Sequence, residues 1–192
     1  MGESGSGATV LVVDDEAEVT DGYALKLRKR YDVETAYGGE EALSVVDDGV
    51  DVVLLDRRMP RRSGDEVLRE IRDRELPCRV IMLTAIDPDF DVVGMPFDDY
   101  LCKPVADDDL YGAIESQLRI GAYEHLGEYF RLAAKRAILE ARLPESRLDD
   151  HTEFADLDER AERLRSTLAD RIEGFEDLVA EFEAVDRVSR RQ

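Results

Sequence analysis

Three short runs of consecutive apolar residues constrain the fold of this chain more than any other feature of its sequence. They cover residues 10–13, 52–55 and 80–83, and each is typical of a strand that is buried on both faces. Stretches with the spacing of amphipathic helices lie between them, so that strand and helix alternate five times over residues 8–119. This alternation predicts an α/β fold in which a parallel sheet is covered by helices on both faces.

The remaining elements of this first part follow from the same patterns. Two further strands are expected over residues 32–36 and 100–101, and helices over residues 16–30, 39–48 and 107–120. Another helix is expected to begin at Ser63, its N-cap, with Glu66 three positions later completing a capping box. We therefore predict a first domain over residues 8–120 that is built on a five-stranded, doubly wound parallel sheet.

Residues 121–192 contain no strand pattern, and apolar residues recur there in steps of three and four. The first stripe consists of Tyr123, Leu126, Phe130, Ala133, Ala137 and Ala141, and the second of Phe154, Leu157, Ala161, Leu164, Leu168, Ile172, Phe175, Val179 and Phe182. The second stripe has a mean step of 3.5 residues, the period of a coiled coil. We predict that this second domain is an α-helical hairpin or coiled-coil extension, or a seam for a second subunit. An ordinary helix packed on the first domain is the alternative.

The charge of the chain limits its partners. The 192 residues include 46 acidic and 26 basic side chains, a formal net charge of −20, and only four of the basic residues are lysines. This balance resembles that of proteins from salt-loving archaea, and an acidic protein from a GC-rich genome is the alternative. A net charge of this size repels phosphates, which excludes non-specific binding of nucleic acid through the whole surface.

The sequence also predicts where the protein works. No apolar run approaches the roughly 20 residues that span a bilayer. The first eight residues lack the pattern of a secretory signal. Two cysteines, Cys78 and Cys102, do not make a disulfide framework, and the predicted strands place them too far apart to pair. We expect a cytoplasmic protein that does not bind membranes.

Polar side chains follow the predicted strands at the point where each strand ends. Asp14 and Asp15 follow the first strand, Asp56 the third, Thr84 the fourth and Lys103 the fifth. The carboxyl ends of parallel strands meet at one edge of the sheet, where α/β proteins bind their ligands. A lone Asp after a strand is usually a helix cap. Three acids, a hydroxyl and a lysine at one edge instead indicate a functional pocket.

The residue types in this pocket suit phosphoryl transfer. Three neighbouring carboxylates repel one another, and a hard divalent cation such as Mg²⁺ relieves that repulsion. One carboxylate is then left to act as a nucleophile toward phosphorus. The metal ion and the lysine would neutralise the phosphoryl oxygens in the transition state, and the hydroxyl of Thr84 would hydrogen-bond the new phosphoryl group.

Four motifs in this order resemble the receiver domain of two-component response regulators, over about residues 8–120. They are Val12-Val13-Asp14-Asp15-Glu16, Asp56-Arg57-Arg58-Met59-Pro60-Arg61-Arg62-Ser63-Gly64, Leu83-Thr84-Ala85 and Asp99-Tyr100-Leu101-Cys102-Lys103-Pro104. The resemblance implies a flavodoxin-like receiver fold and Mg²⁺-dependent acceptance of a phosphoryl group from a sensor histidine kinase. It implies no enzyme activity beyond the chain's own phosphorylation and dephosphorylation.

The same resemblance implies roles for single residues. Asp56 is the implied phosphoacceptor, Thr84 and Lys103 assist it, and Thr84 and Tyr100 form the switch. The implied metal ligands are Asp14, Asp15, Asp56 and the backbone carbonyl of Arg58. The Lys103–Pro104 bond is expected to be cis, as the family suggests.

Some positions of the chain depart from the receiver pattern, and one rival family does not fit the sequence. The segment between Thr84 and Lys103 is short and contains Pro88, Gly94 and Pro96, so we expect its helix to be short or absent. Arg58 and Ile86 stand where the family tunes hydrolysis, which gives the hypothesis of slow autodephosphorylation. The phosphatases of the haloacid dehalogenase family carry Asp-x-Asp-x-Thr after the first strand, and residues 14–18 do not fit that pattern.

Residues 121–192 resemble the HalX extension of haloarchaeal response regulators in composition and position. Two outputs remain open for it. The apolar seam favours protein contacts, either with a second copy in a homodimer or with another partner. The basic stretch 131–147, in which Arg131, Lys135 and Arg142 share a helical face, is the argument for a DNA-binding transcriptional regulator. No helix-turn-helix pattern is visible, and we favour protein contacts.

Overall fold

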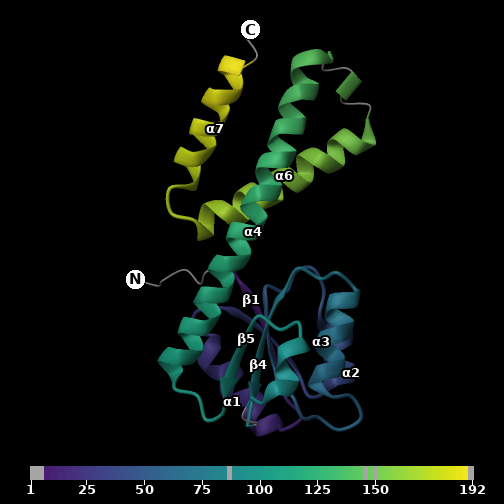
Figure 1. Cartoon of the computed structure of the whole chain (residues 1–192), viewed down its shortest axis with the longest axis vertical. Helices are drawn as coiled ribbons and strands as arrows, with labels where there is room; N and C mark the ends of the chain where they lie inside the picture. The colour runs from purple at the N-terminus through teal and green to yellow at the C-terminus, as the bar shows by residue number, and fades with distance from the viewer. Residues whose placement is uncertain (1–6, 86–87, 145–146, 149–150, 190–192) are drawn as a thin grey trace. The chain divides into compact units, whose positions relative to one another are not determined.

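The protein is described here by a computed structural model that covers residues 7–85, 88–144, 147–148 and 151–189. The chain divides into two compact units, with the division between Leu118 and Arg119. The first unit contains the sheet, and the second is helical (Figure 1).

The first unit is built on a five-stranded sheet in the order β2-β1-β3-β4-β5, with every neighbouring pair parallel. The strands are β1 (Thr9–Val13), β2 (Asp32–Ala36), β3 (Val52–Leu55), β4 (Arg79–Thr84) and β5 (Asp99–Cys102). Its helices are α1 (Ala17–Leu27), α2 (Gly39–Val45), α3 (Gly64–Asp73) and the first part of α4 (Asp107–Arg142). The predicted five-stranded α/β fold is confirmed.

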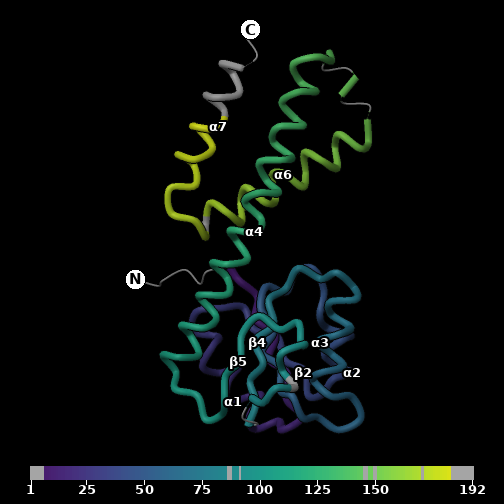
Figure 2. Tube along the Cα trace, viewed as in Figure 1, coloured from purple at the N-terminus to yellow at the C-terminus, as the bar shows by residue number. Residues whose placement is uncertain are grey.

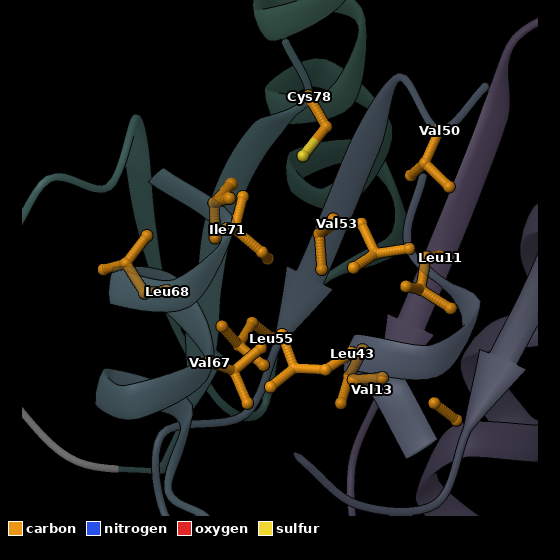
Figure 3. Packing of buried hydrophobic residues seen from close by; sticks show 14 of the residues in the cluster. Leu11, Val13, Leu43, Val50, Val53, Leu55, Val67, Leu68, Ile71 and Cys78 are labelled. Carbon is orange, nitrogen blue, oxygen red and sulfur yellow. The ribbon is translucent and has the colours of Figure 1, made fainter. Parts of the chain in front are cut away.

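The two faces of the sheet carry separate apolar clusters because successive side chains of a strand point to opposite sides. Leu11 and Val53 lie in the cluster that includes buried residues of α2 and α3 (Figure 3). Val10 and Val52, their immediate neighbours in sequence, lie in the cluster that includes buried residues of α1 and α4. Burial on both faces is the physical reason that residues 10–13, 52–55 and 80–83, which make up most of β1, β3 and β4, are all apolar.

The start of α3 has the predicted capping box. The Ser63 hydroxyl accepts a hydrogen bond from the Glu66 amide, and the Glu66 carboxylate accepts one from the Ser63 amide at 2.9 Å. These bonds satisfy two backbone groups that the first turn of a helix leaves without intrahelical partners. The cap fixes where α3 begins, a few residues after the end of β3.

The predicted loss of a helix between β4 and β5 is confirmed for the part of this segment that the structure describes. Only a short 3₁₀ helix, η1 (Phe90–Gly94), is present there. Pro88 and Pro96 flank it, and proline cannot donate the backbone bond that a longer helix would need.

Helix α4 corrects one prediction. The sequence led us to end the last receiver helix at residue 120, but α4 continues without a break from Asp107 to Arg142 (Figure 2). Gly121, the residue after the predicted end, costs a helix interior only about 1 kcal/mol, and no proline follows until Pro144. The division into two units therefore falls inside a continuous helix.

The second unit corrects the prediction of one long coiled-coil stripe. Residues 154–182 form two helices, α6 (Thr152–Arg171) and α7 (Phe175–Ser189). Gly174 lies between them with φ of +76°, a left-handed conformation that glycine adopts without steric cost. The continuous seam is therefore interrupted where we expected a single helix.

The predicted α-helical extension itself is present. The buried apolar cluster of this unit contains Ala122 and Tyr129 of α4, Leu168 of α6 and Phe175 of α7. The guanidinium group of Arg136 on α4 donates hydrogen bonds to Asp158 and Glu162 on α6, at 2.9 and 2.8 Å. The later part of α4 and helix α6 thus pack together as a hairpin, and α7 completes the core of this unit.

Candidate functional site

The backbone of the sheet brings the predicted residues to one edge. The Asp56 amide donates to the Val13 carbonyl at 2.9 Å, which places the residue after β3 beside the end of β1. The Lys103 amide donates to the Thr84 carbonyl at 2.8 Å, which places the residue after β5 beside the end of β4. These bonds continue the parallel ladders by one residue beyond the strands.

The Lys103 side chain joins two of the three predicted acids. Its ammonium group donates a hydrogen bond to Asp56 Oδ1 at 2.9 Å and another to Asp14 Oδ2. Asp14 and Asp56 are both buried, and a buried carboxylate is costly unless it is paired. Burial opposes the charge on Lys103, but the hydrogen bonds and charges of Asp14 and Asp56 outweigh it and raise the pKa of the lysine.

Each carboxylate is also held by the backbone around it. Asp14 Oδ1 accepts a hydrogen bond from the Glu16 amide at 2.9 Å, and the Asp14 carbonyl accepts one from the Thr20 hydroxyl at 3.0 Å. Asp56 Oδ2 accepts a hydrogen bond from the Arg58 amide at 2.7 Å. Because both oxygens of each carboxylate have a donor, the two acids are fixed in position before any ligand arrives.

Gly64 is a position beside the site that our sequence reasoning missed. A Cβ atom at this position would lie 2.1 Å from the Asp56 carbonyl oxygen, so no other residue fits without moving the backbone around Asp56. The Gly64 amide also donates to the Arg57 carbonyl at 2.9 Å. The sequence signal for this close approach, which we did not use, is a glycine at the first position of a capped helix.

Two further predicted residues lie near this edge. Thr84, the last residue of β4, is buried. Tyr100 on β5 is half-buried, packs against the apolar cluster beneath α2 and α3, and has its ring centroid 5.6 Å from that of Phe97. Their role as a switch stays a prediction. Ile86 lies outside the described residues, and slow autodephosphorylation stays a prediction.

The structure also describes other residues for which the sequence made a prediction. Arg57 pairs with Asp65 at the start of α3, with Nε and Oδ1 3.1 Å apart, and Arg58 is exposed. The Lys103–Pro104 peptide bond is cis, as expected. Cys78 and Cys102 are both free thiols, which agrees with the predicted absence of a disulfide between them.

The acidic residues at this edge are the candidate ligands of a metal ion. Within the described part of the chain, no group of three or more His, Cys, Asp or Glu residues is gathered to hold a metal, and Asp15 is exposed. Asp14 and Asp56 nevertheless share one cationic group. Mg²⁺ prefers oxygen ligands and keeps several waters, so it needs only one or two protein carboxylates. The residues present fit Mg²⁺ on that basis.

The acidic pair, the buried hydroxyl and the lysine at the carboxyl edge of this five-stranded parallel sheet match the site that the resemblance to receiver domains of two-component signalling implies. Residues 10–115 match the family described as "Response regulator receiver domain", and this chain belongs to that family. Residues 119–186 match the HalX domain. The chain is therefore a response regulator receiver domain followed by a HalX domain.

Similar proteins agree with this assignment. A protein of Haloferax volcanii named "Putative transcriptional regulator" is 50% identical over 159 residues, which are 82% of this chain and 27% of that protein. This chain thus spans little more than a quarter of that relative. The HalX domain and this relative support a haloarchaeal origin for the chain.

Solved structures resemble the first unit. A CheY-like receiver domain protein from Methanospirillum hungatei superposes with a TM-score of 0.58 and 25% identity, over 62% of this chain and 98% of its own. The response regulator TrrA from Thermotoga maritima, solved in complex with Mg(2+)-BeF, gives a TM-score of 0.50 and 31% identity, over 57% and 98%. Among the described residues of this chain, no helix is long and apolar enough to cross a membrane.

Proposed function

We propose that Asp56 accepts a phosphoryl group from a sensor histidine kinase in a Mg²⁺-dependent reaction, and that this modification switches the helical HalX unit. One observation carries the proposal: the Lys103 ammonium group holds the carboxylates of both Asp14 and Asp56 at the carboxyl edge of the sheet. The pairing leaves the phosphoacceptor fixed in place and next to a cation.

The proposed reaction transfers the phosphoryl group directly from the donor histidine to Asp56. A carboxylate oxygen of Asp56 attacks the phosphorus of the donor, and an acyl phosphate bond forms while the bond from phosphorus to the donor nitrogen breaks. The electron pair of the broken bond returns to the imidazole of the donor histidine. Lys103 supplies positive charge beside the developing phosphoryl oxygens, where a fixed cation stabilises a transition state without reorganisation.

Asp14, Asp15, Asp56 and the backbone carbonyl of Arg58 are the proposed ligands of Mg²⁺. Bound there, the ion would supply charge neutralisation for the transferring phosphoryl oxygens. The structure supports the oxygen-rich character of this edge through the buried Asp14 and Asp56. The chain's own residues orient the acceptor: the Arg58 amide holds one oxygen of Asp56, and Lys103 holds the other.

Thr84 and Tyr100 are the proposed switch residues. Thr84 is buried at the end of β4, and its carbonyl already accepts the Lys103 amide. A new phosphoryl group on Asp56 would offer acceptors to the Thr84 hydroxyl and to Lys103. Its differential contacts with two states of these loops would then shift their populations.

We propose that the HalX unit acts through protein contacts. Helices α4, α6 and α7 bury an apolar core, and several arginines of the unit pair with acidic neighbours within it, as Arg136 does with Asp158 and Glu162. DNA binding through residues 131–147 is the second candidate, because Arg131, Lys135 and Arg142 are exposed. The name of the Haloferax volcanii relative favours that candidate for that protein. A salt-dependent binding assay with genomic DNA fragments separates the two, since phosphate contacts weaken steeply with salt.

The assignment of Asp56 is tested by intact-mass measurement after treatment with a small acyl-phosphate donor. We expect the wild type to gain one phosphoryl group with Mg²⁺ and none without it. Asp56→Asn should gain none, while the control Asp48→Asn, an exposed acid in the loop before β3, should behave as the wild type. Undiminished phosphorylation of Asp56→Asn would remove the central assignment.

We further propose that the protein catalyses only its own phosphorylation and dephosphorylation and works in the cytoplasm. Its partners would be the kinase and the proteins bound by the HalX unit. The same mass measurement tests the first point: phosphoryl transfer onward to another small acceptor, beyond water, would contradict it.

A further inference from the structure

Helix α4 carries a second apolar stripe that its own unit leaves uncovered. The stripe consists of Ile120, Tyr123, Gly127, Ala134, Ile138 and Ala141. Ile120, Tyr123 and Ile138 are among the few large apolar side chains that are exposed in the described part of the chain, and Tyr123 and Ile138 are more than half exposed. At about 100° per residue, this stripe lies on a different face from Ala122 and Tyr129, which are buried in the core of the unit.

The surface around Gly127 is open. A Cβ atom built at this glycine meets no atom nearer than the Arg131 guanidinium, at 4.0 Å. Gly127 and Ala134 sit at the middle of the stripe, where their small side chains would let another helix approach closely. The larger side chains, Tyr123 and Ile138, lie on either side of this middle and would flank the approaching helix.

The spacing of residues along the stripe is the same when it is read from either end. The successive steps are three, four, seven, four and three residues, with the centre between Phe130 and Arg131. Gly127 and Ala134 are equidistant from that centre, and so are Tyr123 and Ile138. An isologous two-fold interface brings each residue of a surface against a different residue of the same surface on the second copy. A stripe with a centre of symmetry meets that requirement when two copies of α4 pack antiparallel.

The charges beside the stripe have the matching polarity. On one flank, Glu124 precedes the centre and Lys135 follows it, while Arg131 lies at the centre itself. In an antiparallel pair, like flanks of the two helices face each other, so the acidic half of one copy meets the basic half of the other. Opposite charges across a helix pair set the orientation of the partners. A parallel pair would not bring these halves together.

We propose that the exposed face of α4 binds a second copy of this chain, with the two α4 helices antiparallel and centred between Phe130 and Arg131. In this dimer Tyr123 of each copy packs near Ile138 of the other, and the two Gly127 residues lie near the two Ala134 residues. The inference rests on the proposed role of the HalX unit in protein contacts and names the partner as the chain itself. It concerns the unphosphorylated chain of 192 residues.

The dimer is tested by sedimentation equilibrium of the full chain in molar KCl. We expect a dimer for the wild type, and a rise in Kd of about 100-fold or more for Tyr123→Glu with Ile138→Glu, because apolar anchors at the centre of an interface dominate its affinity. The control Leu25→Glu places the same charge on an exposed leucine of α1 and should leave the dimer intact. Circular dichroism checks the helix content, and the milder pair Tyr123→Ala with Ile138→Ala replaces the first if that variant loses helicity. A monomeric wild type, or a dimer that survives in the folded variants, would overturn the proposal.

The antiparallel register is tested by oxidative cross-linking in a Cys102→Ser background, since the other native thiol, Cys78, is buried. Tyr123→Cys combined with Ile138→Cys should form a cross-linked dimer far faster than either single variant. Efficient cross-linking of Tyr123→Cys alone would indicate a parallel pair and reject the register. Phosphorylation of Asp56 is measured on the same samples by intact mass: failure there would reject the proposed function and leave the dimer result unaffected.

Discussion

Replacing Lys103 with alanine should destabilise the receiver unit more than any exposed lysine can. The substitution removes the ammonium group from two carboxylates whose side chains are only 6% and 11% exposed, those of Asp14 and Asp56. Removing one partner of a buried ion pair typically costs about 3–5 kcal/mol, because the remaining charge is buried without compensation. Lys103 itself keeps 17% exposure, so water enters part of the vacated space. We therefore expect a loss near the low end, about 3 kcal/mol.

The control is Lys26→Ala. Lys26 pairs with Asp107 at 2.6 Å, but the two side chains are 42% and 56% exposed. Exposed pairs contribute about 0.2–1 kcal/mol. The assay is urea unfolding at constant molar KCl, followed by circular dichroism, with the free energy of unfolding extrapolated to zero urea. Millimolar Mg²⁺ should restore much of the loss in Lys103→Ala, since the ion would replace the missing charge between the same two acids.

The coupling can be measured directly. In a double-mutant cycle, Asp14→Asn should reduce the cost of Lys103→Ala, because one fewer charge is then left unpaired. The reasoning would be refuted if Lys103→Ala cost no more than Lys26→Ala, or if the two substitutions in the cycle were additive. Either result would mean that the ammonium group and the acids do not interact in solution as they do in the structure.

Four further predictions follow from particular contacts. Gly64→Ala should lower the free energy of unfolding by about 2 kcal/mol or more and slow phosphorylation of Asp56, because its Cβ would lie 2.1 Å from the Asp56 carbonyl; Gly112→Ala, a helix position with nothing within 4 Å, should stabilise by about 0.5–1 kcal/mol in the same urea assay. Leu168→Asp should cost several kcal/mol and reduce helicity, since Leu168 is buried in the core of the HalX unit, and an unchanged circular dichroism spectrum would argue against that core. Hydrogen bonds from the backbone amide and hydroxyl of Ser63 lower the pKa of Glu66, so this carboxylate adds stability above its ordinary pKa and loses it as the pH falls through the lowered value; the difference in melting temperature between the wild type and Glu66→Gln should shrink in acid. The melting temperature should rise with KCl between about 0.1 and 3 M, because salt screens the repulsion of a chain with a net charge of −20, and a separate millimolar Mg²⁺ increment should vanish in Asp15→Ala while the KCl dependence remains.

The fold of the first unit could be predicted because each of its signals is local. A strand buried on both faces must be apolar throughout, and residues 10–13 and 52–55 show this directly. The capping box at Ser63 needs only two side chains three positions apart. Parallel topology then follows, since strands that alternate with helices have few other ways to pair.

The second unit was harder because its periodicity carries no mark of where a helix ends. The stripe over residues 154–182 keeps its spacing across Gly174, so the apolar pattern alone does not reveal that the chain turns there. In α4 the error was the opposite: we ended a helix at residue 120, where the strand pattern stops, and the helix continued through Gly121. A single glycine costs little in a helix, and only packing decides whether the chain turns.

The site was predicted as three acids, a hydroxyl and a lysine around a metal ion, and the structure shows which of the acids the lysine contacts. Lys103 already neutralises part of the charge on Asp14 and Asp56. Phosphorylation would replace the single charge of the Asp56 carboxylate with a phosphoryl group that carries close to two negative charges. One lysine cannot balance that increase beside Asp14, and we propose that a second cation does so in the phosphorylated state, with the exposed Asp15 that follows β1 among its ligands. Lys103 must then share its hydrogen bonds between Asp14 and the phosphoryl group. Its backbone amide is bonded to the Thr84 carbonyl at the ends of β5 and β4, so any such redistribution acts first on those two strand ends, a few residues before α4 begins.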